Sequence, residues 1–360
     1  MNHHFAFLPV LVLLPLLPAN GQLVAWDGFE IHPAGAQLES GANNSSGTGL
    51  NGGTGWGGAY NVSNAIKSLV KIEDRSATPV IYSNGQIALH GGLRALRFSE
   101  IANGSPAVVR PLGTVFSAAA GEAVWFSLLF RTASASLLPD QDFFQIGFDN
   151  NANASSGNPR VSVGVNTVST TFPPSQPFQF FVRSTTSTAA NANTFVNGPA
   201  VQAVTTYLLV GCIEPHTGQY DQVSLWINPS DPTAPGTASA TVVLPSGISS
   251  LSHFFLRTAF LDSGDVYVVD EIRIGRDFGS VVLPPSLEGI LGFSPAVIPD
   301  QGFVVRWPAS VTGVTLETSA TLEDGSWAEI TAPFTLQVTD YQFAVPAVPA
   351  IPSAFFRLRR

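Results

Sequence analysis

The chain has 360 residues, of which 45% are hydrophobic and only 11% charged, and its formal net charge is −9. This apolar content argues against a disordered protein, and an acidic balance without a basic stripe argues against nucleic acid as a partner. Good helix formers are scarce, while Thr, Ser, Val and Phe are frequent beside 33 Gly and 27 Pro. Such a composition argues against a helical bundle and favours short strands joined by turns.

The first 21 residues have the pattern of an export signal. Residues 5–18 are uncharged and apolar, and Ala19 and Gly21 place small residues at the −3 and −1 positions of a cleavage site before Gln22. A membrane anchor is the alternative, but the run contains prolines and is shorter than the roughly 20 residues that span a bilayer. We therefore predict a signal peptide over 1–21, a secreted or cell-surface protein, and a mature chain without a transmembrane span.

Strand-like runs recur along residues 22–283, and the Gly, Asn, Ser and Pro clusters between them are typical of turns. The runs occupy 24–30, 93–98, 122–131, 142–148, 160–165, 178–184, 205–214, 222–228, 240–244, 253–261 and 266–275. This pattern, without a helical stripe, predicts an all-β fold in which two antiparallel sheets form a jelly-roll sandwich. A linker is predicted at 284–289, and shorter runs within 290–360 predict a second, smaller β-sandwich.

Several segments carry a resemblance to a known family. They are DGFE at 27–30, NGGTGWGGAYNV at 51–62, VWFSLLFR at 124–131, TYLLVGCIE at 206–214, DQVSLWINP at 221–229 and VVDEIRIG at 268–275. Their order over 22–283 resembles the LamG-like, concanavalin A-like lectin/glucanase domains of secreted bacterial proteins. The segments LETSATLEDGSWAEI and PSAFFRLRR are similar to a small fibronectin-type-III-like carboxy-terminal module. The resemblance implies a concanavalin A-like jelly roll that contacts polysaccharide or glycoprotein glycans, without naming a substrate.

No catalytic motif of that family is present. Retaining glucanases of this fold carry E-x-D-x-x-E on one strand, a spacing that this sequence lacks. The nearest acidic pair is Asp270 and Glu271, and strand alternation predicts that their side chains point to opposite faces. The segments 47–52 and 53–58 satisfy G-x-G-x-x-G, but no strand and helix flank them, so we expect a glycine-rich loop rather than a dinucleotide site.

Asp270 is the candidate metal ligand. Alternation along 266–275 places Asp270 on the same side as the apolar residues Val268 and Ile272. A buried carboxylate requires a cation or several donors. Because the first and last strands of a jelly roll lie near each other, we predict that Asp27 and Asp270 hold Ca²⁺. A structural contact of Asp270 with Arg or backbone N–H groups is the alternative.

Aromatic and polar side chains supply the candidate carbohydrate site, because sugar rings dock on aromatic planes and are oriented by a few polar groups. The candidates are Trp56 and Tyr60 in the glycine-rich loop, Trp125 and Trp226 on the more polar faces of their strands, and Asp149 and Asn150 after a strand. Each pair has a structural alternative. The loop rings would pin the loop to the core, the two tryptophans would lie under covering loops, and the Asp-Asn pair would form a plain turn.

The sequence therefore predicts a secreted, non-catalytic, lectin-like protein that binds extracellular carbohydrate. The first alternative is a structural or adhesive surface protein that binds other proteins or envelope components, with the carboxy-terminal module attaching it to the cell envelope. The second is a divergent glycoside hydrolase. No cofactor other than Ca²⁺ is expected.

Overall fold

In the computed structural model of the chain, the described residues are 23–39, 49–63, 70–99, 107–132, 143–151, 159–167, 178–186, 195–259, 265–283, 292–295, 301–308, 314–319, 325–331, 334–337, 340–346 and 355–359. The predicted signal peptide and the predicted linker at 284–289 lie outside these ranges. Within them, no helix has the length and apolar character needed to cross a bilayer.

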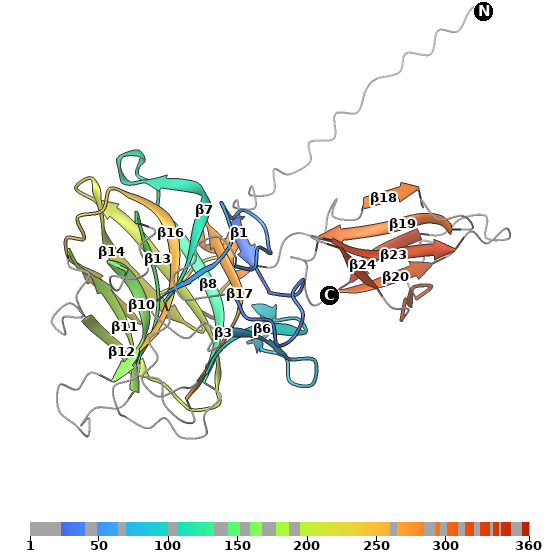
Figure 1. Cartoon of the computed structure of the whole chain (residues 1–360), viewed down its shortest axis with the longest axis horizontal. Helices are drawn as coiled ribbons and strands as arrows, with labels where there is room; N and C mark the ends of the chain where they lie inside the picture. Colours follow the sequence, from blue (N-terminus) through green and yellow to red (C-terminus); the bar gives the residue numbers. More distant parts are fainter. Residues whose placement is uncertain are drawn as a thin grey trace, which may run out of the picture.

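Two antiparallel sheets packed face to face form the large sandwich (Figure 1). The one that we name the back sheet has eight strands within the described ranges. In spatial order they are β15 (Ala240–Val243), β14 (Gln219–Ile227), β13 (Thr206–His216), β8 (Val124–Thr132), β17 (Val266–Gly275), β6 (Arg94–Ser99) and β3 (Val70–Asp74), with β1 (Leu23–Asp27) also pairing with β17. The first strand therefore lies beside the last long strand of the sandwich, as the sequence predicted.

The other sheet, which we name the front sheet, has seven strands in the described part of the chain. In order they are β12 (Phe195–Ala200), β11 (Phe178–Ser184), β10 (Val161–Thr167), β9 (Phe143–Asp149), β16 (Ser250–Ala259), β7 (Ala107–Ser117) and β2 (Asn61–Ser63). Our strand predictions missed β7 because Pro111 and Gly113 interrupt its apolar pattern, and they missed β12 because Gly198 and Pro199 do the same.

The main core lies between the two sheets, because side chains alternate along each strand. Phe126 and Phe130 of β8 point inward and meet Phe148 and Phe144 of β9, with ring centroids 5.1 Å apart in each pair. These contacts place the face of β8 opposite Trp125 in the main core. Cys212 is also fully buried, on the outer side of the back sheet, as expected for an apolar residue.

The outer face of the back sheet is covered. The hairpin of β4 (Ile81–Ser83) and β5 (Ala88–His90) and the short helix α1 (Phe278–Val282) pack on it and form a second apolar cluster with Leu129 and Val210. Helix α1 begins after Asp277, whose side chain accepts a hydrogen bond from the Ser280 amide at 2.9 Å, the usual N-cap contact.

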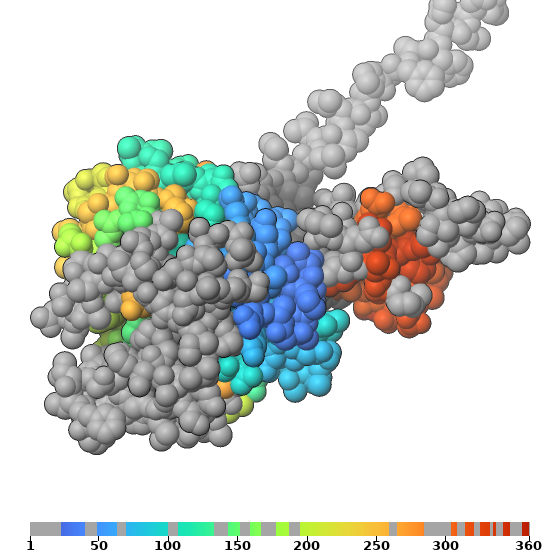
Figure 2. All heavy atoms as spheres, viewed as in Figure 1, coloured from blue at the N-terminus to red at the C-terminus, as the bar shows by residue number. Residues whose placement is uncertain are grey.

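The carboxy-terminal strands form a second, smaller β-sandwich, drawn in orange and red as a separate lobe in Figures 1 and 2. One sheet contains β18 (Gly292–Pro295), β19 (Gln301–Pro308), β23 (Asp340–Pro346) and β22 (Thr335–Gln337), and the other β21 (Ala328–Glu329), β20 (Thr315–Ser319) and β24 (Phe355–Arg359). Its buried core is built by Val305, Trp307, Leu316 and Leu358. The predicted fold class, a large all-β jelly-roll sandwich followed by a smaller β-sandwich, is confirmed.

Candidate functional site

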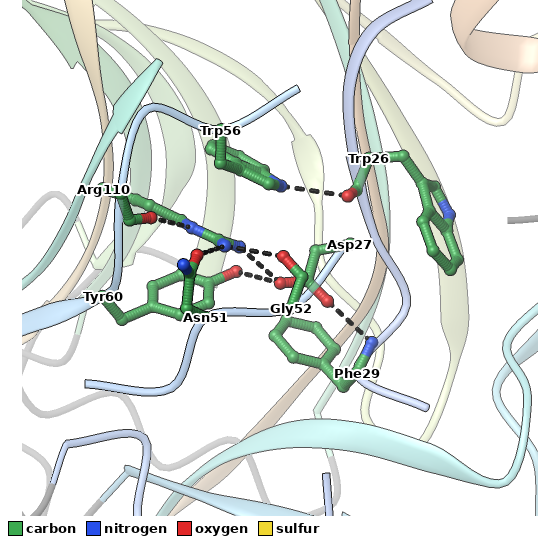
Figure 3. A network of polar contacts seen from close by, with 9 residues as sticks. Trp26, Asp27, Phe29, Asn51, Gly52, Trp56, Tyr60 and Arg110 are labelled. Carbon is green, nitrogen blue, oxygen red and sulfur yellow. Dashed lines mark hydrogen bonds and ion pairs between the residues drawn. The ribbon is translucent and has the colours of Figure 1, made fainter. Parts of the chain in front are cut away.

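A fully buried ion pair joins the two sheets beside β1 (Figure 3). Arg110 of β7 donates through Nη1 to Asp27 Oδ2 at 2.6 Å. Its Nη2 donates to Gly52 O at 2.6 Å and to Asn51 Oδ1 at 3.0 Å, and its Nε donates to Gly58 O at 3.0 Å. Each nitrogen of the guanidinium thus has a partner, and three of the contacts lie in the glycine-rich loop. The pair fastens this loop and β1 to the front sheet.

The two aromatic rings of the loop belong to the same network. Tyr60 is completely buried, and its hydroxyl donates to Asp27 Oδ2 at 2.9 Å. Trp56 donates through Nε1 to Trp26 O at 2.9 Å, and the Arg110 guanidinium lies 4.4 Å from its ring centroid. The structure therefore supports the alternative for this pair, because both rings pin the loop to the core.

The glycines of this loop are required by close backbone contact. Gly53 has a φ of +69°, and a Cβ on it would lie 2.0 Å from Trp26 O. Gly55 has a φ of +77°, and a Cβ on it would lie 1.8 Å from Val24 O. Only glycine fits such positions without displacing β1, which is the role predicted for the two glycine-rich segments.

Trp125 and Trp226 lie on the outer face of the back sheet, the side that alternation predicted. Their rings stack on each other with centroids 5.2 Å apart, and Phe278 of α1 packs edge-on against Trp125 at 5.6 Å. Trp226 is only 9% exposed, and its Nε1 donates to Gly236 O at 3.0 Å. Trp226 is therefore buried, whereas Trp125, which contacts both Trp226 and Phe278, keeps partial exposure.

Asp149 and Asn150 form a fixed turn at the end of β9. Arg160 donates to both oxygens of Asp149, through Nη2 at 2.6 Å and Nε at 3.1 Å, and its Nη2 also contacts Asn150 Oδ1 at 2.6 Å. The three pairs of predicted carbohydrate contacts therefore lie in three separate places, and the structure does not gather them into one site.

Strand β17 contains a bulge that reorients two carboxylates. The pairing with β8 shifts between Asp270 and Arg273, and Glu271 has a left-handed φ of 50°. Asp270 consequently lies on the outer face with Val268, whereas Ile272 returns to the main core. Two predictions are therefore wrong: Asp270 does not share a face with Ile272, and Asp270 and Glu271 do not point to opposite faces. An extra residue in a strand breaks its alternation.

Glu30 joins these two carboxylates in an acidic cluster on the outer side of β17. Arg273 donates to Glu271 Oε2 through Nη2 at 2.7 Å and Nε at 3.1 Å, while Glu271 Oε1 and Asp270 Oδ2 are buried without a hydrogen-bond partner. Burial raises the pKa of Glu30 to about 7. Burial and the charges of Glu271 and Glu30 hold the pKa of Asp270 well above its usual range.

The predicted Ca²⁺ ligands are not equally available. Asp27 is held by Arg110 and Tyr60, and its Oδ1 accepts from the Phe29 amide at 2.9 Å, so a metal would have to break this network. Asp270 Oδ2 and Glu271 Oε1 are unpartnered carboxylate oxygens, the kind of atom that Ca²⁺ takes. Among the described residues, no group of three Asp, Glu, His or Cys converges on a metal position. An ion at Asp270 would therefore complete its shell with backbone oxygens or water.

The outer face of the front sheet carries hydrogen-bonding side chains that the sequence analysis did not single out. Arg183 of β11 lies opposite Ser162 of β10, Gln145 of β9 donates through Nε2 to Ser162 Oγ at 2.5 Å, and Arg257 of β16 lies opposite Gln145. These four residues, which we name the polar stripe, cross four neighbouring strands. They are the main candidate binding site.

Aromatic rings and an unpartnered acceptor flank the polar stripe. The Arg183 guanidinium lies 5.4 Å from the Phe195 ring and that of Arg257 lies 5.7 Å from the Phe143 ring. Asn166, opposite Phe143 on the next strand, has a buried Oδ1 with no hydrogen-bond partner. Arg257 and Phe143 keep partial exposure, whereas Arg183, Ser162 and Gln145 are buried. Access to the stripe is therefore at its Arg257 end.

No protein-family model matches this chain, and no curated protein matches its sequence. Among solved structures, it is similar to the exoplasmic/lumenal domain of VIP36 in its Ca²⁺/Man3GlcNAc-bound form, with 9% identity and a TM-score of 0.35 over 59% of this chain and 85% of that one. It is similar to the T. cruzi calreticulin globular domain, with 12% identity and a TM-score of 0.36 over 61% and 84%. A third is a carbohydrate esterase from the Shiga toxin-encoding bacteriophage phi24B, with 11% identity and a TM-score of 0.34 over 61% and 90%. The ligand of this chain is therefore argued from its own residues.

Proposed function

We propose that this protein is a secreted, non-catalytic binding protein whose large sandwich binds extracellular carbohydrate on the outer face of the front sheet. The polar stripe carries the proposal. It places two guanidiniums, an amide and a hydroxyl across four strands beside aromatic rings, whereas the outer face of the back sheet carries an apolar cluster with α1 and the β4–β5 hairpin and, on β17, the acidic cluster.

The chemistry of the stripe suits a sugar. Hydroxyl groups accept hydrogen bonds from guanidinium and amide N–H groups and donate to carbonyl oxygens, such as the unpartnered Oδ1 of Asn166. The partly exposed ring of Phe143 offers an apolar plane to the C–H face of a sugar ring next to Arg257. A few convergent polar groups beside aromatic rings are typical of ligand sites.

Ca²⁺ belongs to this proposal as a structural ion. Asp270 and Glu271 would hold it on the outer side of β17, away from the polar stripe, where it would neutralise two buried carboxylates. Asp27 is not assigned to it. The proposal gives these carboxylates no catalytic role, because a glycosidase needs its two carboxyl groups on either side of the bound sugar.

The test is saturable binding of the full-length chain to a panel of insoluble and soluble polysaccharides, with bound protein and released reducing sugar both measured. We expect binding without sugar release, and we expect Gln145→Ala to weaken it about tenfold because a hydrogen bond is lost from the stripe. Ser224→Ala is the matched control, since it removes a side-chain hydrogen bond to Thr241 in the back sheet. Absence of binding to every polymer would contradict the proposal and favour a structural or adhesive role, and sugar release would contradict the non-catalytic reading.

A further inference from the structure

The Arg257 guanidinium lacks the partners that a buried charge requires. Its Nε and Nη1 are buried and have no hydrogen-bond partner, and the centre of the guanidinium lies 5.7 Å from the centroid of the Phe143 ring. No described residue forms an ion pair with it. Because buried hydrogen-bonding nitrogens in folded proteins almost always have a partner, nitrogens of this kind are expected to be completed by an acceptor from outside the protein.

A second positive charge lies close by. Arg183 is completely buried at the other end of the polar stripe, and burial together with the charge of Arg257 lowers its pKa to about 10. The carboxylate that the described front sheet offers on this face, Asp149, is already held by Arg160. Two guanidiniums therefore lie near each other in a chain whose net charge is −9, and the carboxylate on their sheet is engaged elsewhere.

We infer that the polar stripe binds an acidic sugar unit, with the carboxylate or sulfate of the sugar accepting hydrogen bonds from Nε and Nη1 of Arg257. This inference rests on the proposed function and names its substrate class. A guanidinium presents two parallel N–H groups that match a planar carboxylate or an edge of a sulfate, and such charge-assisted bonds are about twice as strong as neutral ones. A sugar hydroxyl would then meet Asn166, and the sugar ring would meet the partly exposed ring of Phe143.

The experiment compares polymers that differ only in their charge. The full-length chain is titrated at low salt with polygalacturonate and its carboxyl-reduced form, and with dextran sulfate and dextran. Arg257→Gln is measured beside Arg131→Gln, the matched control, because Arg131 is a partly buried strand arginine of the back sheet. Thermal melting confirms that each variant is folded.

We expect one acidic polymer to bind about tenfold more tightly than its neutral counterpart, and the polymer that does so identifies carboxylate or sulfate as the ligand group. Arg257→Gln should remove this preference and leave the weaker neutral binding, while Arg131→Gln should behave as the unmodified chain. Equal binding of acidic and neutral polymers would overturn the inference and leave the proposed function intact. A preference that survives in Arg257→Gln would also overturn it. Failure of all four polymers and of the wider panel would overturn both.

Discussion

Arg110 and Arg257 lie on neighbouring strands of the front sheet, and they differ in what surrounds them. Arg110 points between the sheets and is completed by Asp27, Asn51 and the carbonyls of the glycine-rich loop. Arg257 points to the outer face, where two of its nitrogens have no partner. A buried charge whose partners are all internal belongs to the fold, whereas one without them is a candidate for an external ligand.

The outer faces of the two sheets also differ in what covers their side chains. On the back sheet, α1 and the β4–β5 hairpin share an apolar cluster with the stacked pair, in which Trp226 is buried and Trp125 is partly exposed. On the front sheet, the outward face carries the polar stripe from Arg183 to Arg257 beside a small apolar cluster of Ala107, Val109 and Phe255. The back sheet therefore buries its outward-facing Trp226, whereas the front sheet leaves two nitrogens of Arg257 without an internal partner.

The largest effect is expected for the buried ion pair. Arg110→Gln leaves Asp27 buried without its charge partner, which should lower the free energy of unfolding by about 3–5 kcal/mol in urea denaturation. Arg131→Gln is the control and should cost about 1 kcal/mol or less, because that arginine makes one long hydrogen bond at 3.3 Å. If Arg110→Gln and Arg131→Gln lowered the free energy of unfolding equally, the Asp27 network would not stabilise the fold.

The covered tryptophan pair gives the next effect. Trp226→Ala removes a 9% exposed indole and should lower the free energy of unfolding by about 3 kcal/mol. Polysaccharide binding per folded molecule should stay unchanged, because the indole stacks on Trp125 and donates to Gly236 O rather than facing solvent. A folded Trp226→Ala variant that no longer bound sugar would indicate that the binding site lies on the back sheet.

Ca²⁺ is expected to have an intermediate effect. If Asp270 and Glu271 hold the ion, Ca²⁺ at about 100 times its dissociation constant should stabilise the chain by about 3 kcal/mol, and a chelator should reverse the gain. Asp270→Asn should abolish the response, whereas Glu329→Gln, a change at an exposed glutamate, should leave it intact. A melting temperature of the unmodified chain that is the same in Ca²⁺ and in chelator would contradict the assignment.

The smallest effect on stability is expected at Arg257. Arg257→Gln removes a guanidinium that has no ion pair among the described residues, so the free energy of unfolding should change by about 0.5 kcal/mol or less. A loss as large as that of Arg110→Gln would mean that Arg257 is an internal structural charge, and the contrast between the two arginines would not hold.

Hydrophobic alternation predicted much of the fold. The bounds of β11 and β17 match the predicted runs at 178–184 and 266–275, because their inward residues are consistently apolar. The face of Asp270 was not predictable in this way, because the bulge at Glu271 depends on pairing with β8 and β1 rather than on the residues of β17 themselves.

The candidate site was less visible in the sequence than the fold. Its residues are single polar positions in otherwise apolar runs, such as Arg183 in FQFFVRS and Arg257 in HFFLRTA. A charged residue on the alternate face of an apolar strand is a detectable signal. What the sequence does not reveal is that β11 and β16 are separated by only two strands, or that Arg257 has no internal partner.

The most direct test of this account is the thermal shift that an acidic polysaccharide produces in three forms of the full-length chain. Tyr60→Phe should lower the melting temperature, since its hydroxyl no longer donates to Asp27, yet it should keep the ligand-induced rise of the unmodified chain. Arg257→Gln should have the same melting temperature as the unmodified chain without ligand, and the acidic polysaccharide should no longer raise it. Loss of the rise in Tyr60→Phe, or its persistence in Arg257→Gln, would contradict the assignment of ligand binding to the polar stripe.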